Sequence, residues 1–309
     1  MMAARVSIGI IGTGWVGASV AISTLHGGVA QELLLSDKRG ELAEGEAMDL
    51  AHAAPFYPAA TVRSVGVGEM RGTDAVVIAA GRGGGPGESR LDLLRDNAAI
   101  LRDLAGRFRD YAGTIVVVTN PVDVLTHVVQ AASGLPPERV IGTGTMLDTA
   151  RLRQVLGREL SVDPHSIHAH VVGEHGDSEV VVWSGARVGG TALRRWPGWS
   201  AEREEAAARE VRTAAYEIIR RKGATNHAIG LVTATLLKTL MRGERRVLTV
   251  SRVQTGAAGI DGVALSLPTI VGADGATEVL EPELEDGERA ALHRSADVLR
   301  KALASIEGS

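Results

Sequence analysis

Gly12-Thr13-Gly14-Trp15-Val16-Gly17 is the stretch that decides the fold, because its glycines have the spacing G-x-G-x-x-G. The apolar run at residues 5–11 before it predicts a buried strand, and residues 18–25 after it predict a helix. In such a strand–turn–helix unit, the first glycine allows a tight turn and the second lets the backbone approach a bound phosphate closely. The third lets the helix pack against the strand, with its N-terminal N–H groups facing the anion.

Strand-like and helix-like segments alternate along the chain from this turn to about Gly142. Strands are predicted at residues 32–36, 74–80 and 114–118, and helices at residues 41–52 and 91–108. This alternation predicts a parallel sheet with helices on both faces.

The second half has longer helices and paired strands. Helices are predicted at residues 149–160, 200–222, 226–241 and 285–306, and an antiparallel strand pair at residues 246–251 and 262–271. The chain is therefore predicted to be an α/β protein with two domains. A Rossmann-type doubly wound parallel sheet is expected in residues 1–142, and an α+β substrate-binding domain in residues 143–309.

Asp37 stands at the end of the second predicted strand, where a carboxylate can accept hydrogen bonds from a ribose diol. The same carboxylate repels a 2′-phosphate, so it favours NAD over NADP as the cofactor. The predicted cofactor-binding residues in this part of the chain are Gly12, Gly14, Trp15, Val16, Gly17 and Asp37. The alternative is an ordinary strand–helix turn, because the chain contains 38 glycines.

The composition excludes several classes of partner. The net charge of −4 and the aromatic content of 3% argue against nucleic-acid binding. The chain has no cysteine, which excludes disulfides and thiolate catalysis, and we expect no metal ion. The N-terminus lacks the pattern of a signal peptide, and no apolar run is long enough to span a membrane. We therefore expect a soluble, cytoplasmic protein with no membrane or nucleic-acid partner.

Four longer strings carry a resemblance to a known family. The sequence resembles the lactate/malate dehydrogenase family, and most closely the bacterial L-lactate dehydrogenase branch, from about Val6 to Leu303. The resemblance implies an NAD-dependent dehydrogenase of small 2-hydroxy acids. The strings are Pro86-Gly87-Glu88-Ser89-Arg90-Leu91-Asp92-Leu93, Thr119-Asn120-Pro121-Val122-Asp123, Gly142-Thr143-Gly144-Thr145-Met146-Leu147-Asp148-Thr149-Ala150-Arg151 and Gly173-Glu174-His175-Gly176-Asp177-Ser178-Glu179.

The resemblance assigns three catalytic residues. Reduction of a 2-oxo acid needs a hydride at C2 and a proton at the carbonyl oxygen, and His175 matches the histidine that donates the proton. Asp148 matches the aspartate that orients this histidine and stabilises its charged form. Arg90 matches an arginine on a mobile loop that polarises the carbonyl. Taken singly, His175 could be an ordinary turn residue and Asp148 a helix cap, but their occurrence together in the family strings favours catalysis.

The resemblance also assigns residues that bind substrate and cofactor. Arg151 matches the arginine that binds the substrate carboxylate through two N–H groups, although by itself it could be a surface charge. Asn120 matches an asparagine near the reacting carbonyl and the cofactor. Thr143 matches a hydroxyl residue beside the nicotinamide, and Thr225 matches a small residue on the wall of the substrate pocket.

Gly84 is where the sequence departs from the family. Counted back from Arg90, it stands at the position where lactate enzymes have glutamine and malate enzymes have arginine. No side chain from Gly84 can neutralise a second carboxylate, which argues against oxaloacetate and predicts a pocket open to larger 2-oxo acids. Arg82 could swing inward in its place, but an exposed loop charge is the favoured interpretation.

Arg153 and His168 match two positions that bind fructose 1,6-bisphosphate in activated bacterial lactate dehydrogenases. They could also be an ordinary helix arginine and strand histidine.

The resemblance further suggests a homotetramer, or failing that a homodimer. Two alternatives to a lactate dehydrogenase are a malate dehydrogenase and a catalytically silent NAD-binding protein.

Overall fold

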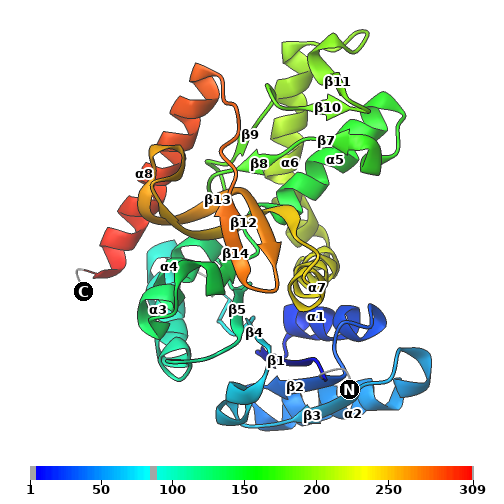
Figure 1. The fold of residues 1–309 in the computed structure, drawn as a ribbon, viewed down its shortest axis with the longest axis vertical. Coiled ribbons are helices and arrows are strands. Elements are labelled where there is room, and N and C mark those ends of the chain that lie inside the picture. Colours follow the sequence, from blue (N-terminus) through cyan, green and yellow to red (C-terminus); the bar gives the residue numbers. More distant parts are fainter. Residues whose placement is uncertain (1–4, 84–88, 308–309) are drawn as a thin grey trace.

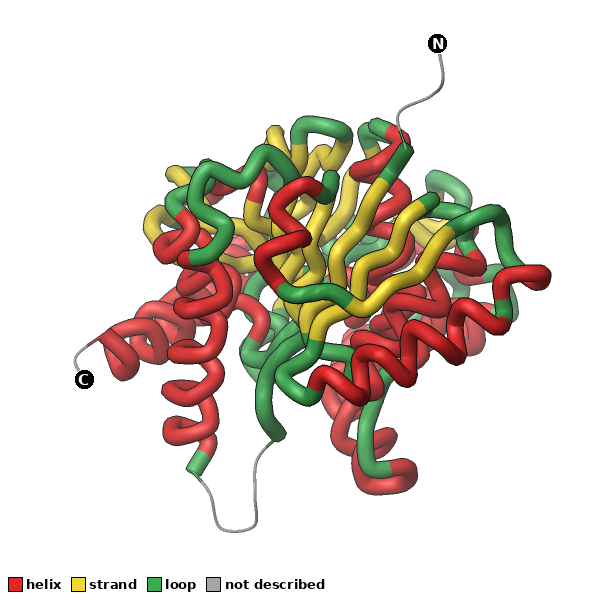
Figure 2. Tube along the Cα trace, turned by 90° about the horizontal axis from the view of Figure 1, so that it is seen from below, coloured by secondary structure: helices red, strands yellow, loops and turns green. Residues whose placement is uncertain are grey.

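The computed structural model describes residues 5–83 and 89–307, and its centre is one large sheet (Figure 1). Among these residues the sheet has nine strands in the order β14-β13-β12-β6-β5-β4-β1-β2-β3. The strands run through the middle of the molecule with helices to either side (Figure 2). This confirms the predicted doubly wound sheet.

The parallel part of the sheet comes from the first half of the chain. Neighbouring strands in the series from β6 to β3 all pair in parallel. Every residue of β4 and β5 is buried, which is why these strands are continuous apolar runs rather than alternating ones. The strands are β1 (Ser7–Ile11), β2 (Glu32–Ser36), β3 (Thr61–Ser64), β4 (Ala75–Ile78), β5 (Thr114–Val117) and β6 (Val140–Gly142).

The helices of the first half are α1 (Trp15–His26), α2 (Gly40–His52), α3 (Arg90–Gly106) and α4 (Val122–Ser133). α1 begins earlier than predicted because Gly14 is its N-cap, so the turn proper contains only Gly12, Thr13 and Gly14. α4 was not predicted. The helical pattern is nevertheless present in its sequence, because its polar residues recur at i, i+3, i+4 and i+7. These residues are Asp123, Thr126, His127 and Gln130.

The second half contributes four long helices and an antiparallel extension of the sheet. The helices are α5 (Met146–Leu160), α6 (Ala201–Lys222), α7 (His227–Arg242) and α8 (Asp286–Glu307). The long strands are β12 (Arg246–Thr255), β13 (Asp261–Gly272) and β14 (Gly275–Val279). The short strands are β7 (Ile167–His168), β8 (Val171–Val172), β9 (Val180–Val181), β10 (Arg187–Val188) and β11 (Thr191–Ala192).

The two halves are joined in one sheet, because β12 pairs antiparallel with β6 where Ser251 faces Gly142. A second junction is the contact of α7 with α1. A Cβ atom on Gly230 would lie 2.6 Å from the Ser19 carbonyl oxygen, so only glycine permits this close approach. The proposed division of the chain after Gly142 falls at the end of β6.

Within the part of the chain that the structure describes, none of the helices combines the length and the apolar character needed to cross a membrane.

Candidate active site

The glycine turn joins β1 to α1 and leaves space above the second glycine. Gly12 has φ of +95°, and a Cβ atom there would lie 2.5 Å from the backbone nitrogen of Ala80. A Cβ atom on Gly17 would lie 1.8 Å from the Gly12 carbonyl oxygen. A Cβ atom on Gly14 would meet no described atom within 4 Å. Gly12 and Gly17 are thus required by the turn itself, whereas Gly14 leaves room for a bound group.

Asp37 lies beside this turn at the end of β2. Its Oδ2 accepts a hydrogen bond from the Thr13 backbone N–H at 2.9 Å, and its Oδ1 accepts one from the Arg39 N–H at 3.0 Å. Burial alone would raise the pKa of Asp37, but these two N–H groups hold it below its ordinary value. An ionised carboxylate therefore stands where a ribose diol would need an acceptor.

A cavity of about 710 Å³ lies beside the glycine turn. It runs from the turn past Asp37 to α3, and Gly12, Gly14 and Asp37 all line it. The open space over Gly14, the N-terminus of α1 and the ionised Asp37 beside the turn fit a dinucleotide. Trp15 and Val16 are not among the lining residues, since Trp15 is 62% exposed and Val16 packs toward the core.

A second group of residues gathers around Asp148 in the first turn of α5. Asp148 is 2% exposed, and its Oδ2 lies 2.5 Å from Nδ1 of His175. Its Oδ1 accepts a hydrogen bond at 2.9 Å from the Arg151 guanidinium, one helical turn later. The i,i+3 spacing puts Asp148 and Arg151 on one face of α5. The structure thus brings together three residues that the sequence predicted to act together.

The pKa values of the pair follow from this geometry. Burial lowers the pKa of His175, but the charge and hydrogen bond of Asp148 outweigh it and raise the value to about 9. Burial opposes ionisation of Asp148, yet His175 and Arg151 hold its pKa below the ordinary value. At neutral pH the histidine therefore carries a proton that it can donate, and the aspartate is charged.

Asp123 is a residue of this site to which the sequence reasoning assigned no role. It is 2% exposed in the first turn of α4, and its Oδ2 accepts a hydrogen bond at 2.7 Å from the backbone N–H of His175. Burial raises the pKa of Asp123 to about 6, against the lowering effects of the Ser251 hydroxyl and of that N–H. The contact fixes the turn that carries His175.

The turn of His175 is also held from its other side. Gly173 has φ of +85° and forms a bridge with Ser266 of β13. The backbone N–H of Glu174 donates to the Ser295 hydroxyl of α8 at 2.8 Å. The partner residues Ser266 and Ser295 lie outside the strings that define the family resemblance, so no sequence signal pointed to these two contacts.

Other predicted site residues lie on the surrounding segments. The side chain of Asn120 accepts a hydrogen bond from the Val122 N–H at 3.2 Å, at the start of α4. Thr143 is buried after β6, and its N–H donates to the Val117 carbonyl at 3.0 Å. Thr225 is half-buried between α6 and α7. Their roles toward a ligand stay predictions.

Two predicted residues cannot be placed. Gly84 lies outside the described residues, and so does the side chain of Arg90, whose backbone begins α3. Arg82 forms an ion pair with Asp96 of α3, and its Nε donates to the Asp96 carboxylate at 2.7 Å.

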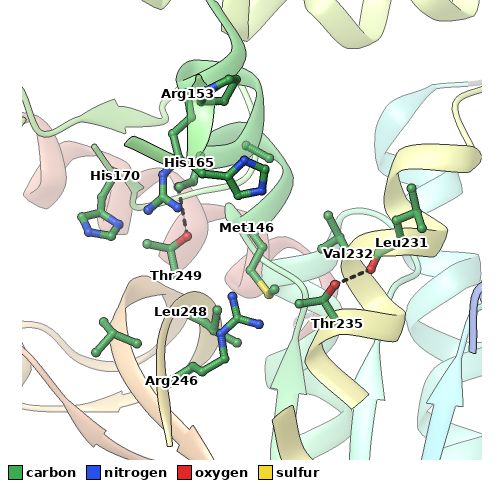
Figure 3. Close-up of a pocket in the computed structure, with 14 residues that line it drawn as sticks. Met146, Arg153, His165, His170, Leu231, Val232, Thr235, Arg246, Leu248 and Thr249 are labelled. Carbon is green, nitrogen blue, oxygen red and sulfur yellow. Dashed lines mark hydrogen bonds between the residues drawn. The ribbon is translucent and has the colours of Figure 1, made fainter. Parts of the chain in front are cut away.

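Arg153 lines a separate cavity of about 390 Å³ between α5, α7 and β12 (Figure 3). Arg246 lines it as well, as do His165 and His170. Burial and the charge of Arg246 lower the pKa of Arg153. His168 is exposed on β7 and is not among the lining residues, so Arg153 shares the cavity with Arg246 rather than with His168.

Comparison with known proteins gives a consistent result over the full length. The model of the lactate/malate dehydrogenase NAD binding domain matches residues 6–142, and that of the family's alpha/beta C-terminal domain matches residues 145–308. An L-lactate dehydrogenase of Thermus aquaticus is 44% identical over 306 residues, covering 97% of this chain and 99% of that protein. One of Salinibacter ruber is 43% identical over 312 residues, covering 99% of each.

The fold comparison agrees. The crystal structure of the minor L-lactate dehydrogenase from Enterococcus mundtii in the ligands-bound form matches with a TM-score of 0.95 at 38% identity, covering 98% of both chains. A lactate dehydrogenase from a Medee basin deep-sea metagenome library also gives 0.95, at 37% identity. The chain belongs to the lactate/malate dehydrogenase family and is an NAD-dependent oxidoreductase.

Proposed function

We propose that this chain interconverts pyruvate and L-lactate with NAD, with relaxed selectivity for the side chain of the 2-oxo acid. The observation that carries the proposal is the 2.5 Å contact between His175 Nδ1 and Asp148 Oδ2, with Arg151 on the other oxygen of the same carboxylate. The relatives named as L-lactate dehydrogenases support the choice of substrate.

In the proposed mechanism each step of proton transfer is carried out by a side chain of the protein. Bound NADH supplies the hydride that reaches C2 of the 2-oxo acid. His175 keeps Nδ1 on Asp148, so its Nε2 proton is the one available to the carbonyl oxygen. The histidine becomes neutral as the alcohol forms, and in the reverse direction neutral His175 takes the hydroxyl proton. Asp148 stabilises the charged form of His175 throughout.

Substrate binding is assigned to the remaining residues. Arg151 has five N–H donors, and its bond to Asp148 leaves donors for the substrate carboxylate. In this proposal Arg90 polarises the carbonyl, Asn120 contacts the carbonyl and the cofactor, and Thr143 and Thr225 border the nicotinamide and the substrate.

The alternatives are weaker on specific grounds. A malate dehydrogenase needs a partner for a second carboxylate, which Gly84 lacks, and Arg82 is engaged with Asp96. A silent NAD-binding protein would have no use for a buried acid that orients a charged histidine. We further propose that the enzyme acts in the cytoplasm as a homotetramer, with a homodimer as the alternative.

The first prediction concerns His175. His175→Asn removes the proton donor, so kcat for pyruvate reduction should fall by roughly 10²–10⁴-fold, while the Kd for NADH stays unchanged. Stopped-flow turnover and NADH fluorescence titration measure the two quantities. His52→Asn, at the end of α2, is the matched control and should behave as wild type. Near-normal turnover in the His175 variant would contradict the role of His175 as the proton donor.

The second prediction separates two glycines of the same turn. Gly17→Ala forces a Cβ atom onto a carbonyl oxygen, so the free energy of unfolding should fall by about 1–3 kcal/mol. Gly14→Ala should change stability by less than about 0.5 kcal/mol, but should weaken NADH binding at least tenfold by occupying the open space. Urea unfolding and NADH titration report the two effects. Equal NADH affinity in Gly14→Ala and wild type contradicts the proposed cofactor position.

The third prediction concerns the substrate. Because a buried unpaired carboxylate is costly, kcat/KM for pyruvate should exceed that for oxaloacetate by roughly 10²-fold. The small residue at 84 should allow 2-oxobutyrate and 2-oxoisocaproate to react as well. Gly84→Arg supplies a cation and should shift the preference toward oxaloacetate. A wild-type enzyme that prefers oxaloacetate is instead a malate dehydrogenase.

The fourth prediction concerns the cavity of Arg153. We propose that it binds fructose 1,6-bisphosphate, with His168 at its periphery, because two arginines facing one cavity can pair with a phosphate. Millimolar sugar bisphosphate should lower the KM for pyruvate in wild type and have no effect in Arg153→Ala. Arg158→Ala, which breaks an exposed pair with Glu210, should retain the response. An unresponsive wild type removes the proposal.

A further inference from the structure

Glu179 is a buried acid near the catalytic pair that the mechanism above does not use. Its residue is only 6% exposed, four positions after His175 at the end of the same turn. The backbone N–H of Glu179 donates to the Gly176 carbonyl at 3.1 Å, which fixes where the side chain starts. Its Oε1 is shielded from solvent and has no hydrogen-bond partner among the described residues.

Four charged side chains act electrostatically on Glu179. Asp148 and Arg151 act on it from α5, Arg212 from α6, and His175 from its own turn. Burial favours the neutral form of the carboxyl group and the negative charge of Asp148 favours it further. The three cations oppose this effect but do not cancel it, so the pKa of Glu179 is raised to about 8.

A purely structural role explains this residue poorly. A carboxyl group with a buried oxygen that has no partner costs free energy that a glutamine with bonded amide groups or a leucine would not cost. An acid in this position gains a use only if its ionisation matters to the neighbouring groups. The group that it would affect most is the substrate carboxylate, which is proposed to bind at Arg151.

We propose that Glu179 is a second titrating acid of the active site, and that it must carry a proton for the substrate carboxylate to bind at Arg151. The inference rests on the proposed function. An ionised Glu179 would add a carboxylate to a buried cluster that already contains Asp148 and has to accept the charge of the substrate. Like charges in a site of low dielectric constant repel each other strongly.

The sign of the pH dependence follows. Glu179 is neutral at pH 6.5 and leaves binding unaffected, but it ionises as the pH rises through about 8. His175 loses its proton at about pH 9, which also weakens binding. Asp123, which faces the His175 backbone from α4, titrates near pH 6 and stays ionised over the alkaline range. Two groups therefore have to gain a proton for binding at alkaline pH.

The test uses oxamate, which carries the substrate carboxylate, and the complete enzyme with NADH. Its affinity is measured by quenching of NADH fluorescence from pH 6.5 to 9.5. In wild type the plot of log affinity against pH should steepen toward a slope of −2, and in Glu179→Gln it should not exceed −1. Both proteins should bind oxamate within about twofold of each other at pH 6.5, where Glu179 is neutral.

Two variants serve as controls. Glu179→Asp keeps an acid at this position and should retain the two-proton profile. Glu205→Gln changes an exposed acid on α6 and should leave the profile as in wild type. Calorimetry in two buffers of different ionisation enthalpy gives an independent measure of the protons taken up on binding. Oxamate binding at pH 9 should take up more than one proton in wild type, and about half a proton in Glu179→Gln.

The outcomes separate the two proposals. If wild type fails to bind oxamate at pH 6.5, the proposed function is wrong and the role of Glu179 falls with it. If wild type binds oxamate but shows a slope of −1 and takes up less than one proton at pH 9, the function stands and the role of Glu179 is overturned. A slope of −2 that persists in Glu179→Gln also overturns it, because the second proton then belongs to another group.

Discussion

The site depends on one buried carboxylate whose two oxygens have different cationic partners. Asp148 is 2% exposed, and such a charge is stable only when it is paired and hydrogen-bonded. His175 at 2.5 Å and Arg151 at 2.9 Å meet that requirement. In the proposed mechanism the same two contacts set the chemistry, because one charges the proton donor and the other orients the group that would receive the substrate. Stability and function of this site therefore have the same physical origin.

The fold supplies these contacts from segments far apart in the chain. α5 follows β6 directly, so Asp148 and Arg151 stand at the carboxyl end of a central strand, where ligands bind in open α/β sheets. The turn of His175 is fixed by Asp123 of α4 and by the bridge between Gly173 and Ser266 of β13. Because β12 and β13 extend the parallel sheet, the donor's turn and α5 share one rigid support.

A feature of the fold or of the site could be predicted from the sequence where residues close together in the chain determine it. The glycine turn and Asp37 are local patterns that the sequence predicted, and the family resemblance implied the roles of Asp148 and Arg151. α4 also has a local pattern, since its polar residues recur at helical spacing, so its absence from the predicted helices does not reflect a missing signal. The role of Asp123 rests on a contact 52 residues along the chain, and no local spacing encodes such a contact. The interaction of Arg153 with Arg246 likewise depends on β12 folding back beside α5.

Asp148 and Glu179 show why residue type alone could not assign roles to the two acids near His175. Both are almost completely buried, and burial by itself favours the neutral form of each. Asp148 has a direct hydrogen bond from each of two cations, so its ionised form is the stable one. Nearby cations also act on Glu179, but none of the described residues donates a hydrogen bond to its Oε1. The negative charge of Asp148 further favours the neutral form of Glu179. The ionisation of the first acid thus helps to keep the second one neutral. A histidine pocket that must accept an anionic substrate needs this asymmetry, because two ionised acids would offset the cations that the substrate has to meet.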